Sequence, residues 1–443
     1  MGRQISTRYL LIGNSAGAVA AAEAVRELDA SGPMTIVSDE RYPAYSRPLI
    51  SDYLAGHRSI RQTFLRGPRF YSKNGIETLL GTKATRLDTE ARVVELEDGT
   101  AVRWEKLLLA TGGSPIRADV AGISRGGVFT FTTLDDAVAL RREIDSASRV
   151  VVIGGGLIGV SVSQALVGIG AKVILVELMD RILGAALDSQ ASTIVEARLR
   201  EAGVKVITGR SVREIIGARE NGRRAAGVVL DDGREIACQA VVSAVGVSPR
   251  TDLVKGTAVK TRRGIVVDSQ MMTSCPDVYA CGDVAEVYDF ARGETRPNPI
   301  WPNAVMGGRI AGHNMARAPG MPARTYEGST NLNAFNYFGM AIVSAGIVEP
   351  PKNGGYRVLR SRASGGRYRR VVLKDGRVVG AVFAGDIQSA GVVYGLMRAG
   401  IDTHGFERAL AAEDFSFASL PPHVRQRLLG GAGIEESEQN AGR

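Results

Sequence analysis

Two glycine-rich turns carry the residues whose types and spacing suit nucleotide chemistry. The clearer turn spans residues 154–159, reads GGGLIG and directly follows the apolar run 150–153. A glycine at the first position permits a tight turn, the second lets the backbone approach a pyrophosphate, and the third lets the helix pack on the strand. The helix that follows would present free N–H groups to the phosphates. We therefore predict a dinucleotide site at Gly154, Gly156, Leu157, Ile158 and Gly159.

An acidic residue follows this turn at the distance expected for a ribose contact. Glu177 comes 23 residues after Gly154, at the end of the apolar run 172–176. A carboxylate there can accept a hydrogen bond from the ribose 2′-hydroxyl and would repel a 2′-phosphate. The sequence therefore favours NAD over NADP. Arg181, one helical turn later, argues against this preference, because an arginine there can accommodate a 2′-phosphate.

The other turn spans residues 13–18 and reads GNSAGA. Ser15 replaces the second glycine and Ala18 the third; alanine is an accepted variant, whereas serine crowds the pyrophosphate slightly and adds a hydroxyl donor. We predict binding by Gly13, Ser15, Ala16 and Gly17, with Asp39 or Glu40 on the adenosine ribose.

The elements around both turns repeat the order strand, helix, strand. Each half then continues through an Asp-Gly hairpin to a buried strand that runs into glycine. The repeated elements are the strands 9–12, 34–37, 150–153 and 172–176, the helices near 18–28 and up to 167, the hairpins Asp98-Gly99 and Asp232-Gly233, and the segments 107–112 and 241–246. This repetition predicts two Rossmann-like nucleotide-binding domains in an α/β fold.

A third element indicates what the first site holds. The segment 273–283 reads as a strand that ends in Gly-Asp, followed by a helix start. The carboxylate of Asp283 can bond a sugar-alcohol hydroxyl, and a helix start can face phosphate. An extended FAD needs this second clamp, whereas a single dinucleotide fingerprint does not.

The pattern changes after Tyr326. The segments 368–373 and 377–383 alternate around Asp375-Gly376 as a hairpin, and a helix is expected near 387–399. These elements predict a small α+β domain. The expected domains are an FAD-binding domain at 1–115 and 247–320, an NAD-binding domain at 116–246, a C-terminal α+β interface domain at 325–425 and a disordered tail at 430–443.

Composition narrows the class of protein. No window approaches the ~20 apolar residues of a membrane span, and the N-terminus shows no secretion signal. Three cysteines cannot build a disulfide framework, so we expect a cytoplasmic setting. The net charge of +9 fits a basic surface that keeps the protein soluble, or one that attracts an acidic protein partner or anionic cofactors. The sequence has no basic stripe with interleaved aromatic residues, so we do not expect a nucleic-acid partner. The four histidines lack the spacing of metal ligands, so we predict no metal site.

These features, in this order, resemble the FAD-dependent pyridine nucleotide–disulfide oxidoreductase superfamily. The resemblance covers about residues 9–418 and includes ATG at 110–112 and YACGD at 279–283. Within it, YSRPLIS at 45–51 and FAGDI at 383–387 are similar to the branch of ferredoxin and rubredoxin reductases, the NADH-dependent nitrite reductase large subunit and apoptosis-inducing factor.

The resemblance implies FAD and NAD(H) as cofactors and assigns roles to further residues. On the FAD side it implies Asp39, Glu40 and Arg47 at the adenosine and pyrophosphate, Ala84 at the adenine, Thr111 and Gly112 beside the flavin, and Asp283 at the ribitol. It also implies that Asn303 and Ala304 begin a helix facing the flavin pyrimidine ring, and that Gly246 approaches the nicotinamide.

Three departures from the superfamily bear on chemistry. No cysteine precedes Cys238, so a thiol–flavin mechanism is not expected. Ferredoxin reductases carry a lysine and a glutamate beside the reactive flavin nitrogen, where this chain has Asp52 and Ser161, and Arg250 replaces an asparagine. With hydride passing directly between cofactors, no catalytic side chain is expected, and Asp52, Ser161 and Asn303 form the flavin environment.

Together these features predict an NADH-dependent FAD oxidoreductase that passes electrons to, or takes them from, an acidic iron–sulfur carrier such as ferredoxin or rubredoxin. One alternative is an NADH oxidase or quinone reductase that uses a small acceptor. Another is a flavoprotein subunit with an assembly or signalling role. The sequence leaves open a homo-oligomer or a place in a larger redox complex.

Overall fold

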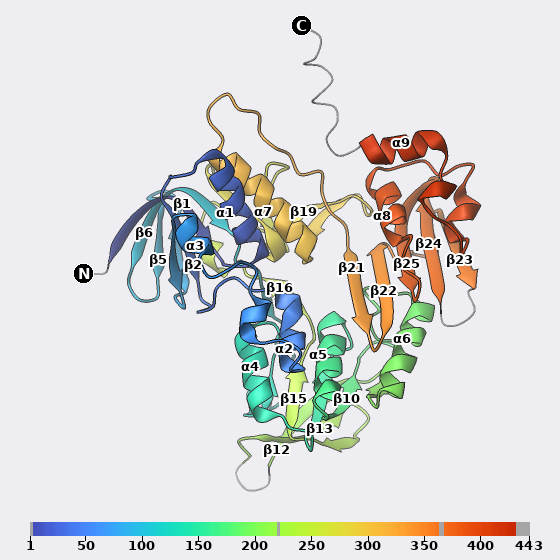
Figure 1. Cartoon of the computed structure of the whole chain (residues 1–443). Helices are drawn as coiled ribbons and strands as arrows, with labels where there is room; N and C mark the ends of the chain where they lie inside the picture. The colour runs from blue at the N-terminus through green and yellow to red at the C-terminus, as the bar shows by residue number, and fades with distance from the viewer. Residues whose placement is uncertain (1–2, 219–221, 363–366, 431–443) are drawn as a thin grey trace.

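A computed structural model describes residues 3–218, 222–362 and 367–430 of the chain. The chain folds into three units, with the first and last lying on either side above the second (Figure 1). The expected disordered tail, 430–443, lies outside the described residues except for Gly430. Within those residues, no helix combines the length and apolar character needed to cross a membrane.

The first unit contains a seven-stranded sheet in which β18 pairs with β6 beside the path β3-β2-β1-β6-β5-β4. The bounds are β1 Gln4–Ile12, β2 Met34–Ser38, β3 Ile76–Leu80, β4 Ala84–Asp88, β5 Val93–Leu96, β6 Ala101–Leu109 and β18 Val278–Ala280. The Asp98-Gly99 hairpin is confirmed between the antiparallel strands β5 and β6. Because β18 runs parallel to β6, a late segment of the chain completes the first sheet, which supports the proposed assignment of 247–320 to this unit.

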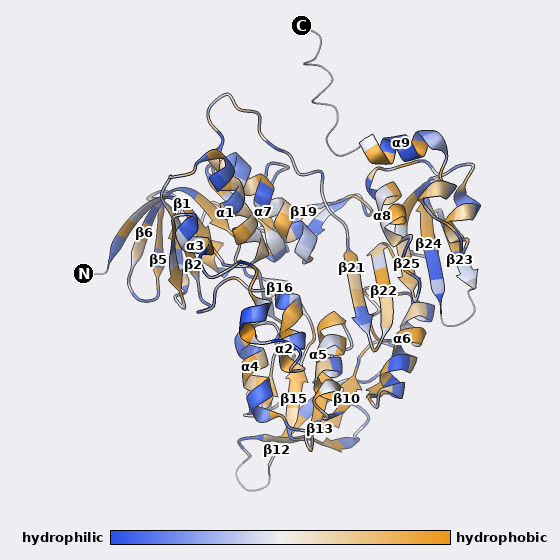
Figure 2. Cartoon of the chain, viewed as in Figure 1, coloured by the Kyte–Doolittle hydropathy of each residue, from blue (hydrophilic) through white to orange (hydrophobic). Residues whose placement is uncertain are grey.

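Two helices of this unit, α1 (Ala16–Leu28) and α7 (Trp301–Ala316), pack against each other. A Cβ on Gly308 would overlap the carbonyl oxygen of Gly17, and one on Gly312 would overlap that of Ala21. The close approach of two helix backbones therefore requires these glycines. In Figure 2, which colours the chain by hydropathy, α1 and α7 each carry both hydrophobic and hydrophilic residues.

The second unit holds the parallel sheet β11-β10-β9-β15-β8. Its strands are β8 Val128–Phe129, β9 Arg149–Ile153, β10 Lys172–Val176, β11 Lys205–Ile207 and β15 Ala240–Ser243, and its helices are α4 Leu134–Glu143, α5 Leu157–Gly168 and α6 Ser189–Glu201. A second sheet joins β12 (Val212–Gly217), β13 (Ala225–Leu230) and β14 (Glu235–Ala237), with the predicted Asp232-Gly233 hairpin confirmed between the last two.

The first two units are connected by two adjacent crossings. The strand β7 (Gly113–Pro115) leaves the first unit and pairs antiparallel with β16 (Val247–Pro249), which returns to it. The helix α2 (Ile50–Leu54) belongs to the first unit but packs against α4 and α5 of the second. Short elements complete the first unit: η1 Arg47–Leu49, η2 Ile60–Thr63, α3 Phe70–Lys73, η3 Asp252–Val254, β17 Ile265–Val266, η4 Gly282–Val284, β19 Ala285–Asp289 and β20 Glu294–Pro297.

The C-terminal unit is an antiparallel sheet in the order β21-β22-β25-β24-β23. Its elements are β21 Leu332–Tyr337, β22 Met340–Gly346, β23 Tyr356–Arg362, β24 Tyr368–Lys374, β25 Arg377–Ala384, α8 Ala390–Arg398, η5 Glu407–Ala411, η6 Phe417–Ser419 and α9 Pro422–Gly430. The hairpin at Asp375-Gly376 is confirmed, with φ of 49° and 70° at its two central residues. The two Rossmann-like units and this small α+β unit agree with the predicted fold class.

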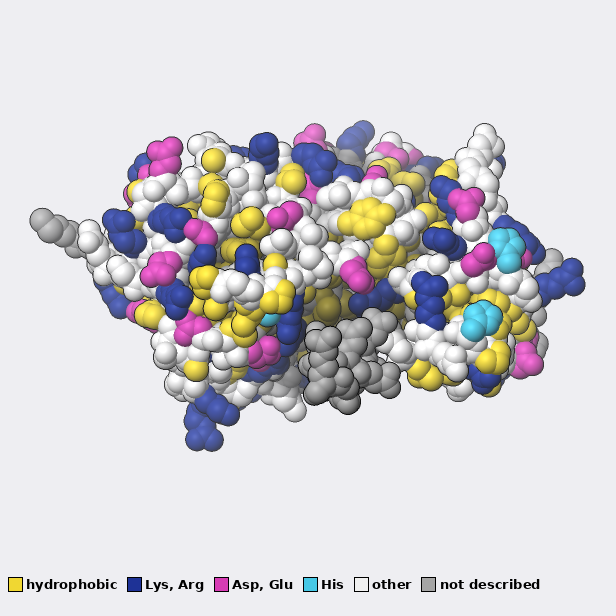
Figure 3. All heavy atoms as spheres, turned by 90° about the horizontal axis from the view of Figure 1, so that it is seen from above, with side chains coloured by type: hydrophobic (Ala, Val, Ile, Leu, Met, Phe, Trp, Pro, Cys, Tyr) yellow, Lys and Arg dark blue, Asp and Glu magenta, His cyan; other side chains and the backbone are white. Residues whose placement is uncertain are grey.

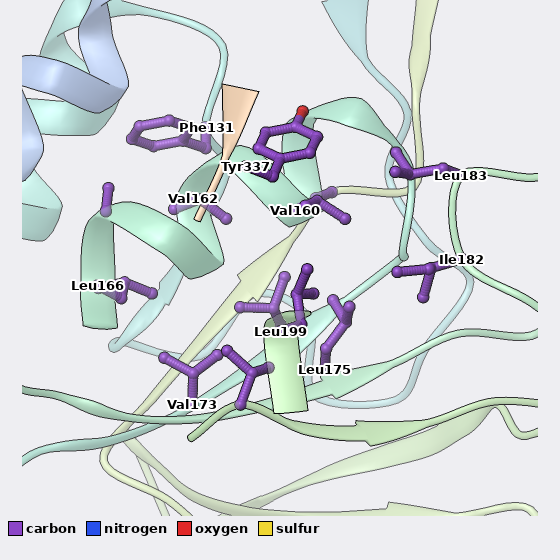
Figure 4. Close-up of a cluster of buried hydrophobic side chains, with 14 of the residues drawn as sticks. Phe131, Val160, Val162, Leu166, Val173, Leu175, Ile182, Leu183, Leu199 and Tyr337 are labelled. Carbon is purple, nitrogen blue, oxygen red and sulfur yellow. The ribbon is translucent and has the colours of Figure 1, made fainter. Parts of the chain in front are cut away.

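One apolar cluster extends through all three units. It joins Leu54 of α2, Leu134 of α4, Val160 of α5 and Tyr337 at the end of β21. Figure 4 shows Phe131 and the Tyr337 ring beside Val160 and Val162. Burial of this shared cluster holds the units together, at about 25 cal/mol per Å² of apolar surface removed from water.

Candidate functional site

The turn after β9 has the geometry of a nucleotide-binding loop. Gly154 has a φ of 104°, and a Cβ on it would lie 2.5 Å from the carbonyl oxygen of Ala244. A Cβ on Gly159 would overlap the carbonyl oxygen of Gly154. Gly156 differs, because it is exposed and a Cβ there would meet no atom within 4 Å. The protein's own packing explains Gly154 and Gly159, whereas the open space at Gly156 suits a ligand that approaches the backbone.

The helices that follow both turns begin without a side-chain cap. The N-cap residues are Ser15 for α1 and Gly156 for α5, and no side-chain hydrogen bond caps either helix. In contrast, Thr133 and Asp188 cap α4 and α6 by accepting first-turn N–H groups. The first turns of α1 and α5 can therefore donate their N–H groups to phosphate oxygens. These turns include the predicted residues Ala16, Gly17, Leu157 and Ile158.

Glu177 lies just after β10, with its carboxylate against the glycine turn. Its Oε2 accepts a hydrogen bond from the Gly155 N–H at 2.5 Å, and its Oε1 accepts one from the N–H two residues later at 2.7 Å. The guanidinium of Arg181 lies 3.1 Å from Asp180 and 3.9 Å from Glu349. Among the described residues, no Lys or Arg forms an ion pair with Glu177, whereas Asp180 and Glu349 offset the positive charge of Arg181.

The first glycine turn repeats the contact made by the second. Gly13 has a φ of 117°, and a Cβ on it would overlap the carbonyl oxygen of Ala110, as at the equivalent pair in the second unit. Ser15, at the start of α1, is partly exposed. A Cβ on Gly17 would lie 2.8 Å from the sulfur of Cys281, so Gly17 lets α1 approach the end of β18.

The residues after β2 separate into two groups. Glu40 forms an ion pair with Arg47 and accepts a hydrogen bond from the Tyr45 hydroxyl. Asp39 is exposed, and its Oδ2 lies 2.9 Å from Nη1 of Arg250. Glu40 is therefore committed to holding Arg47, and we propose Asp39 as the carboxylate that meets the adenosine ribose.

Ala84 begins β4, close to the end of β2. The preceding segment is tied to β2 by two backbone bonds, from Thr82 N to Ser38 O at 3.0 Å and from Gly81 N to Glu40 O at 3.2 Å. This arrangement brings Ala84 toward Asp39, as an adenine contact would require.

Asp283 lies in η4, a single 3₁₀ turn, directly before β19. The predicted helix start after Asp283 is therefore wrong, because Ala285 and Val287 are buried in the core and β19 pairs with β17 and β20. In the part of the chain that the structure describes, the Asp283 carboxylate has no hydrogen-bond partner. Burial raises its pKa, against the opposing charge of Arg47. A half-buried carboxyl group without a partner suits a hydroxyl-bearing ligand.

The two crossings between the units tie the segment of the predicted flavin residues to the segment of the predicted nicotinamide residue, with Gly112 and Gly246 beyond opposite ends of the β7–β16 pair. Thr111 Oγ1 donates to the carbonyl oxygen of Arg250, and the Arg250 N–H donates to the Gly112 carbonyl oxygen, both at 2.9 Å. The Ile116 N–H donates to the carbonyl oxygen of Gly246, also at 2.9 Å. These bonds fix both segments relative to each other.

The helix α7 begins at Trp301, two residues before the predicted start at Asn303. Pro302 in the first turn explains the difference, since proline suits that position. Asn303 is buried; its Nδ2 donates to the Asn298 carbonyl oxygen at 2.7 Å, and its Oδ1 accepts from the Tyr326 hydroxyl at 2.8 Å. Its side chain therefore secures the helix start, and Ala304 follows it in the same turn.

The predicted flavin neighbours Asp52 and Ser161 have different partners. Asp52 lies 3.1 Å from Arg58. The Ser161 hydroxyl lies 3.0 Å from the Tyr337 hydroxyl, which donates to the Leu157 carbonyl oxygen at 3.1 Å. A phenol carries one proton, so we infer that Ser161 donates to Tyr337. The C-terminal unit thus holds the first turn of α5.

Replacing Tyr337 with phenylalanine should weaken NADH binding about 3–10-fold and lower stability by about 1–2 kcal/mol, because it leaves the hydroxyl of Ser161 and the carbonyl of Leu157 without their shared partner. Burial raises the pKa of Tyr337 to about 12, so the effect should not vary between pH 6 and pH 9. The measurements are the NADH dissociation constant and the melting temperature. Tyr368→Phe, which alters a different contact of the same unit, is the control; lower stability with unchanged NADH affinity would refute the positioning role.

The cysteines give no sign of redox chemistry. All three are free, and burial raises the pKa of Cys238 to about 11 and that of Cys281 to about 12. Both thiols therefore remain protonated at neutral pH and serve packing. Across the described ranges, no group of three or more His, Cys, Asp and Glu side chains could hold a metal ion.

Two contributors to the site are not apparent in the sequence. Tyr337 comes from the C-terminal unit, and no motif in the sequence marks it. Arg250 joins Asp39 to Ser114, with its Nε donating to the Ser114 hydroxyl at 2.8 Å. Sequence comparison with the superfamily identifies Arg250 as a departure but does not supply its partners.

Comparisons with known proteins match most of the chain. The family model described as pyridine nucleotide-disulphide oxidoreductase matches residues 7–308, and the model described as the rubredoxin NAD+ reductase C-terminal domain matches residues 329–401. A subunit of Aromatoleum evansii, the epsilon subunit of NADH-dependent phenylglyoxylate dehydrogenase, is 33% identical and aligns with 87% of this chain and 90% of its own length.

Two further proteins align over nearly their whole length. The NADH-rubredoxin oxidoreductase of Clostridium acetobutylicum is 28% identical, with 86% of this chain and 92% of that protein covered. The solved ferredoxin reductase for the CYP199A2 system of Rhodopseudomonas palustris has a TM-score of 0.81 at 25% identity, with 96% of this chain and 100% of that chain covered.

Proposed function

This chain belongs to the pyridine nucleotide-disulphide oxidoreductase family, and on that premise we propose that it transfers hydride between NADH and FAD and exchanges electrons with an iron–sulfur carrier. Its cofactors are FAD and NAD(H). The observation that carries the proposal is the pair of glycine turns, each leading into a helix without a side-chain cap and each closed by the same backbone contact, Gly13 to Ala110 and Gly154 to Ala244.

The residues present fit both cofactors. The open space beside the Gly156 backbone suits the approach of a pyrophosphate, and Asp283 offers a carboxyl group that has no hydrogen-bond partner among the described residues. We propose that FAD is held by Gly13, Ser15, Ala16, Gly17, Asp39, Arg47, Ala84, Thr111, Gly112, Asp283 and Ala304, with Glu40 orienting Arg47. We propose that NAD(H) is held by Gly154, Gly156, Leu157, Ile158, Gly159, Glu177 and Gly246.

The protein's own contribution is placement and exclusion of water. Bound FAD supplies a centre that accepts two electrons as hydride and releases electrons one at a time. The crossings at Gly112 and Gly246 set the two nucleotide sites against each other. Ile116 and Val245 are 41% and 37% exposed beside Gly246 and would cover an apolar ring bound there. The start of α7 directs its positive dipole end toward the first site, where it would stabilise negative charge.

Anaerobic titration with NADH tests the proposal. The purified protein should be yellow, NADH should bleach it, and a ferredoxin or rubredoxin added afterwards should be reduced while the colour returns. A colourless protein that takes up no flavin would refute the FAD assignment. If NADH bleaches the protein but no iron–sulfur carrier is then reduced, the proposal that such a carrier accepts the electrons would be refuted.

A second candidate follows from the relative in Aromatoleum evansii, whose name describes a subunit of an NADH-dependent dehydrogenase. This chain would then be the NADH-reactive subunit of a larger redox complex, with the iron–sulfur centre on a partner subunit. Copurification with other subunits at fixed stoichiometry would favour this candidate over a freely diffusing carrier. We propose the cytoplasm as the setting, supported by three free cysteines.

Glu177→Ala should weaken NADH binding about tenfold and NADPH binding much less, because a hydrogen bond to a charged group contributes about 1.5–3 kcal/mol. Glu177→Gln is the matched variant, since it keeps the shape and one acceptor but removes the charge that repels a 2′-phosphate. It should improve the NADPH to NADH affinity ratio. Dissociation constants for both nucleotides check the prediction, and a preference of the unmodified protein for NADPH would contradict it.

A further inference from the structure

A groove with only positive charge among its lining residues lies beside α2. Its volume is about 610 Å³, and residues 56–62 together with Tyr53 and Arg141 form its walls. His57, Arg58 and Arg61 are exposed in it, and no Asp or Glu lines it. From this we infer that the groove is the docking surface for the acidic face of the iron–sulfur carrier, an inference that rests on the proposed function.

The cations in the groove differ in how far they are neutralised. Arg58 is paired with Asp52 at 3.1 Å. Arg141 donates to the Tyr53 carbonyl oxygen at 2.7 Å and stacks over the Tyr53 ring at 4.9 Å, and it forms no ion pair with a carboxylate in the part of the chain that the structure describes. Within the described residues, the guanidinium of Arg61 has neither an ion pair nor a hydrogen bond. Arg61 and Arg141 are therefore available to carboxylates of a partner.

The groove is preorganised for binding. Ser59 and Gln62 form a capping box at η2, in which the Ser59 N–H donates to Gln62 Oε1 at 2.8 Å. Thr63 is fully buried and donates to the Ile60 carbonyl oxygen at 2.6 Å. A short segment fixed at both ends loses little entropy when a partner binds. The exposed arginines consequently project from a rigid base.

The position of the groove suits electron exchange. It continues directly from α2, which lies where the first two units meet (Figure 1). Asp52, a proposed neighbour of the flavin, is on α2 and contacts Arg58 of the groove wall. An acidic carrier seated here would lie beside the flavin site, and long-range attraction would speed its arrival at low salt. The face shown in Figure 3, in contrast, has its Lys and Arg side chains scattered among acidic and apolar ones.

Charge reversal at Arg61 tests the inference with the FAD-loaded protein. Arg61→Glu should raise the KM for an acidic ferredoxin or rubredoxin about tenfold at low ionic strength, and the difference should shrink in 0.5 M salt as the charges are screened. Turnover of NADH with ferricyanide should be unchanged. Arg213→Glu is the matched control, because Arg213 is an exposed arginine on β12 that undergoes the same change in charge.

Binding of the oxidised carrier, measured separately by calorimetry, distinguishes the groove from the proposed function. Weaker binding to Arg61→Glu than to Arg213→Glu supports the groove even if the carrier is not reduced, in which case only the proposed function fails. Equal KM and equal affinity in the two variants would overturn the groove. A wild-type protein that neither binds nor reduces any acidic iron–sulfur carrier overturns both.

Discussion

Asp188→Ala should lower the free energy of unfolding by about 3–5 kcal/mol, the range found when one partner of a buried ion pair is removed. Asp188 and Arg370 have side chains only 1% and 2% exposed, and their Oδ2 and Nη1 atoms are 2.7 Å apart. The Tyr368 hydroxyl also donates to Asp188, at 2.5 Å. Among the described residues, the substitution would leave the half-exposed Glu349, at 3.2 Å, as the remaining carboxylate partner of the buried Arg370 charge. It would also remove the N-cap of α6.

The effect should concentrate where the C-terminal unit meets the NAD-binding unit, because Asp188 belongs to the latter and Arg370 to β24. Urea unfolding followed by circular dichroism gives the stability. Hydrogen exchange should show faster exchange in β24 and at the start of α6 than in the first sheet. Loss of less than about 1 kcal/mol would contradict the prediction, since that is the range of a surface pair.

Two variants separate the ion pair from general damage. The double variant Asp188→Leu/Arg370→Met should recover much of the stability, because apolar residues of similar size can replace a buried pair without leaving a charge behind. Glu349→Gln should change stability by less than about 1 kcal/mol, since Glu349 is 43% exposed. A double variant as unstable as Asp188→Ala would indicate that packing, and not the unpaired charge, explains the loss.

The parts of the fold that local chemistry determines could be predicted from the sequence. Gly13 and Gly154 are followed by the expected helices, and all three Asp-Gly pairs form hairpins, because each feature depends on a few neighbouring residues. The internal repeat predicted two similar nucleotide-binding units. Asp283 marks the limit of this approach. The segment after it forms a strand instead of the predicted helix, because pairing with β17 on one side and with β20 on the other, together with burial of its apolar side chains, decides its conformation.

Contacts between units could not be predicted. Nothing local to Tyr337 indicates that its hydroxyl meets Ser161, 176 residues earlier in the chain. Similarly, the sequence predicted 368–373 as a hairpin strand without a partner for Arg370, yet this arginine is among the most buried large side chains because it pairs with Asp188. A charge pattern along one strand contains no information about a partner on another unit. The candidate site was therefore predictable where it consists of glycine turns and strand ends, and not where the C-terminal unit contributes.

Gly156→Val should weaken NAD(H) binding about 100-fold or more while leaving the fold and the FAD content unchanged. Each factor of ten corresponds to about 1.4 kcal/mol, and a branched side chain at this position would occupy the space proposed for the pyrophosphate. Without nucleotide the substitution should be nearly neutral, since a Cβ at Gly156 meets no protein atom within 4 Å and the backbone there has a φ of −75°. The loss should therefore appear in the NADH dissociation constant and not in the melting temperature of the nucleotide-free protein.

Gly159→Val is the contrasting variant on the same helix. A Cβ on Gly159 overlaps the carbonyl oxygen of Gly154, so this change should lower the melting temperature as well as NADH affinity. Gly156→Ala should fall between wild type and Gly156→Val in affinity, with unchanged stability. The two positions thus separate a glycine required by the ligand from one required by the protein. If Gly156→Val binds NADH as tightly as wild type, the pyrophosphate does not cross the start of α5, and the nucleotide lies elsewhere in the second unit.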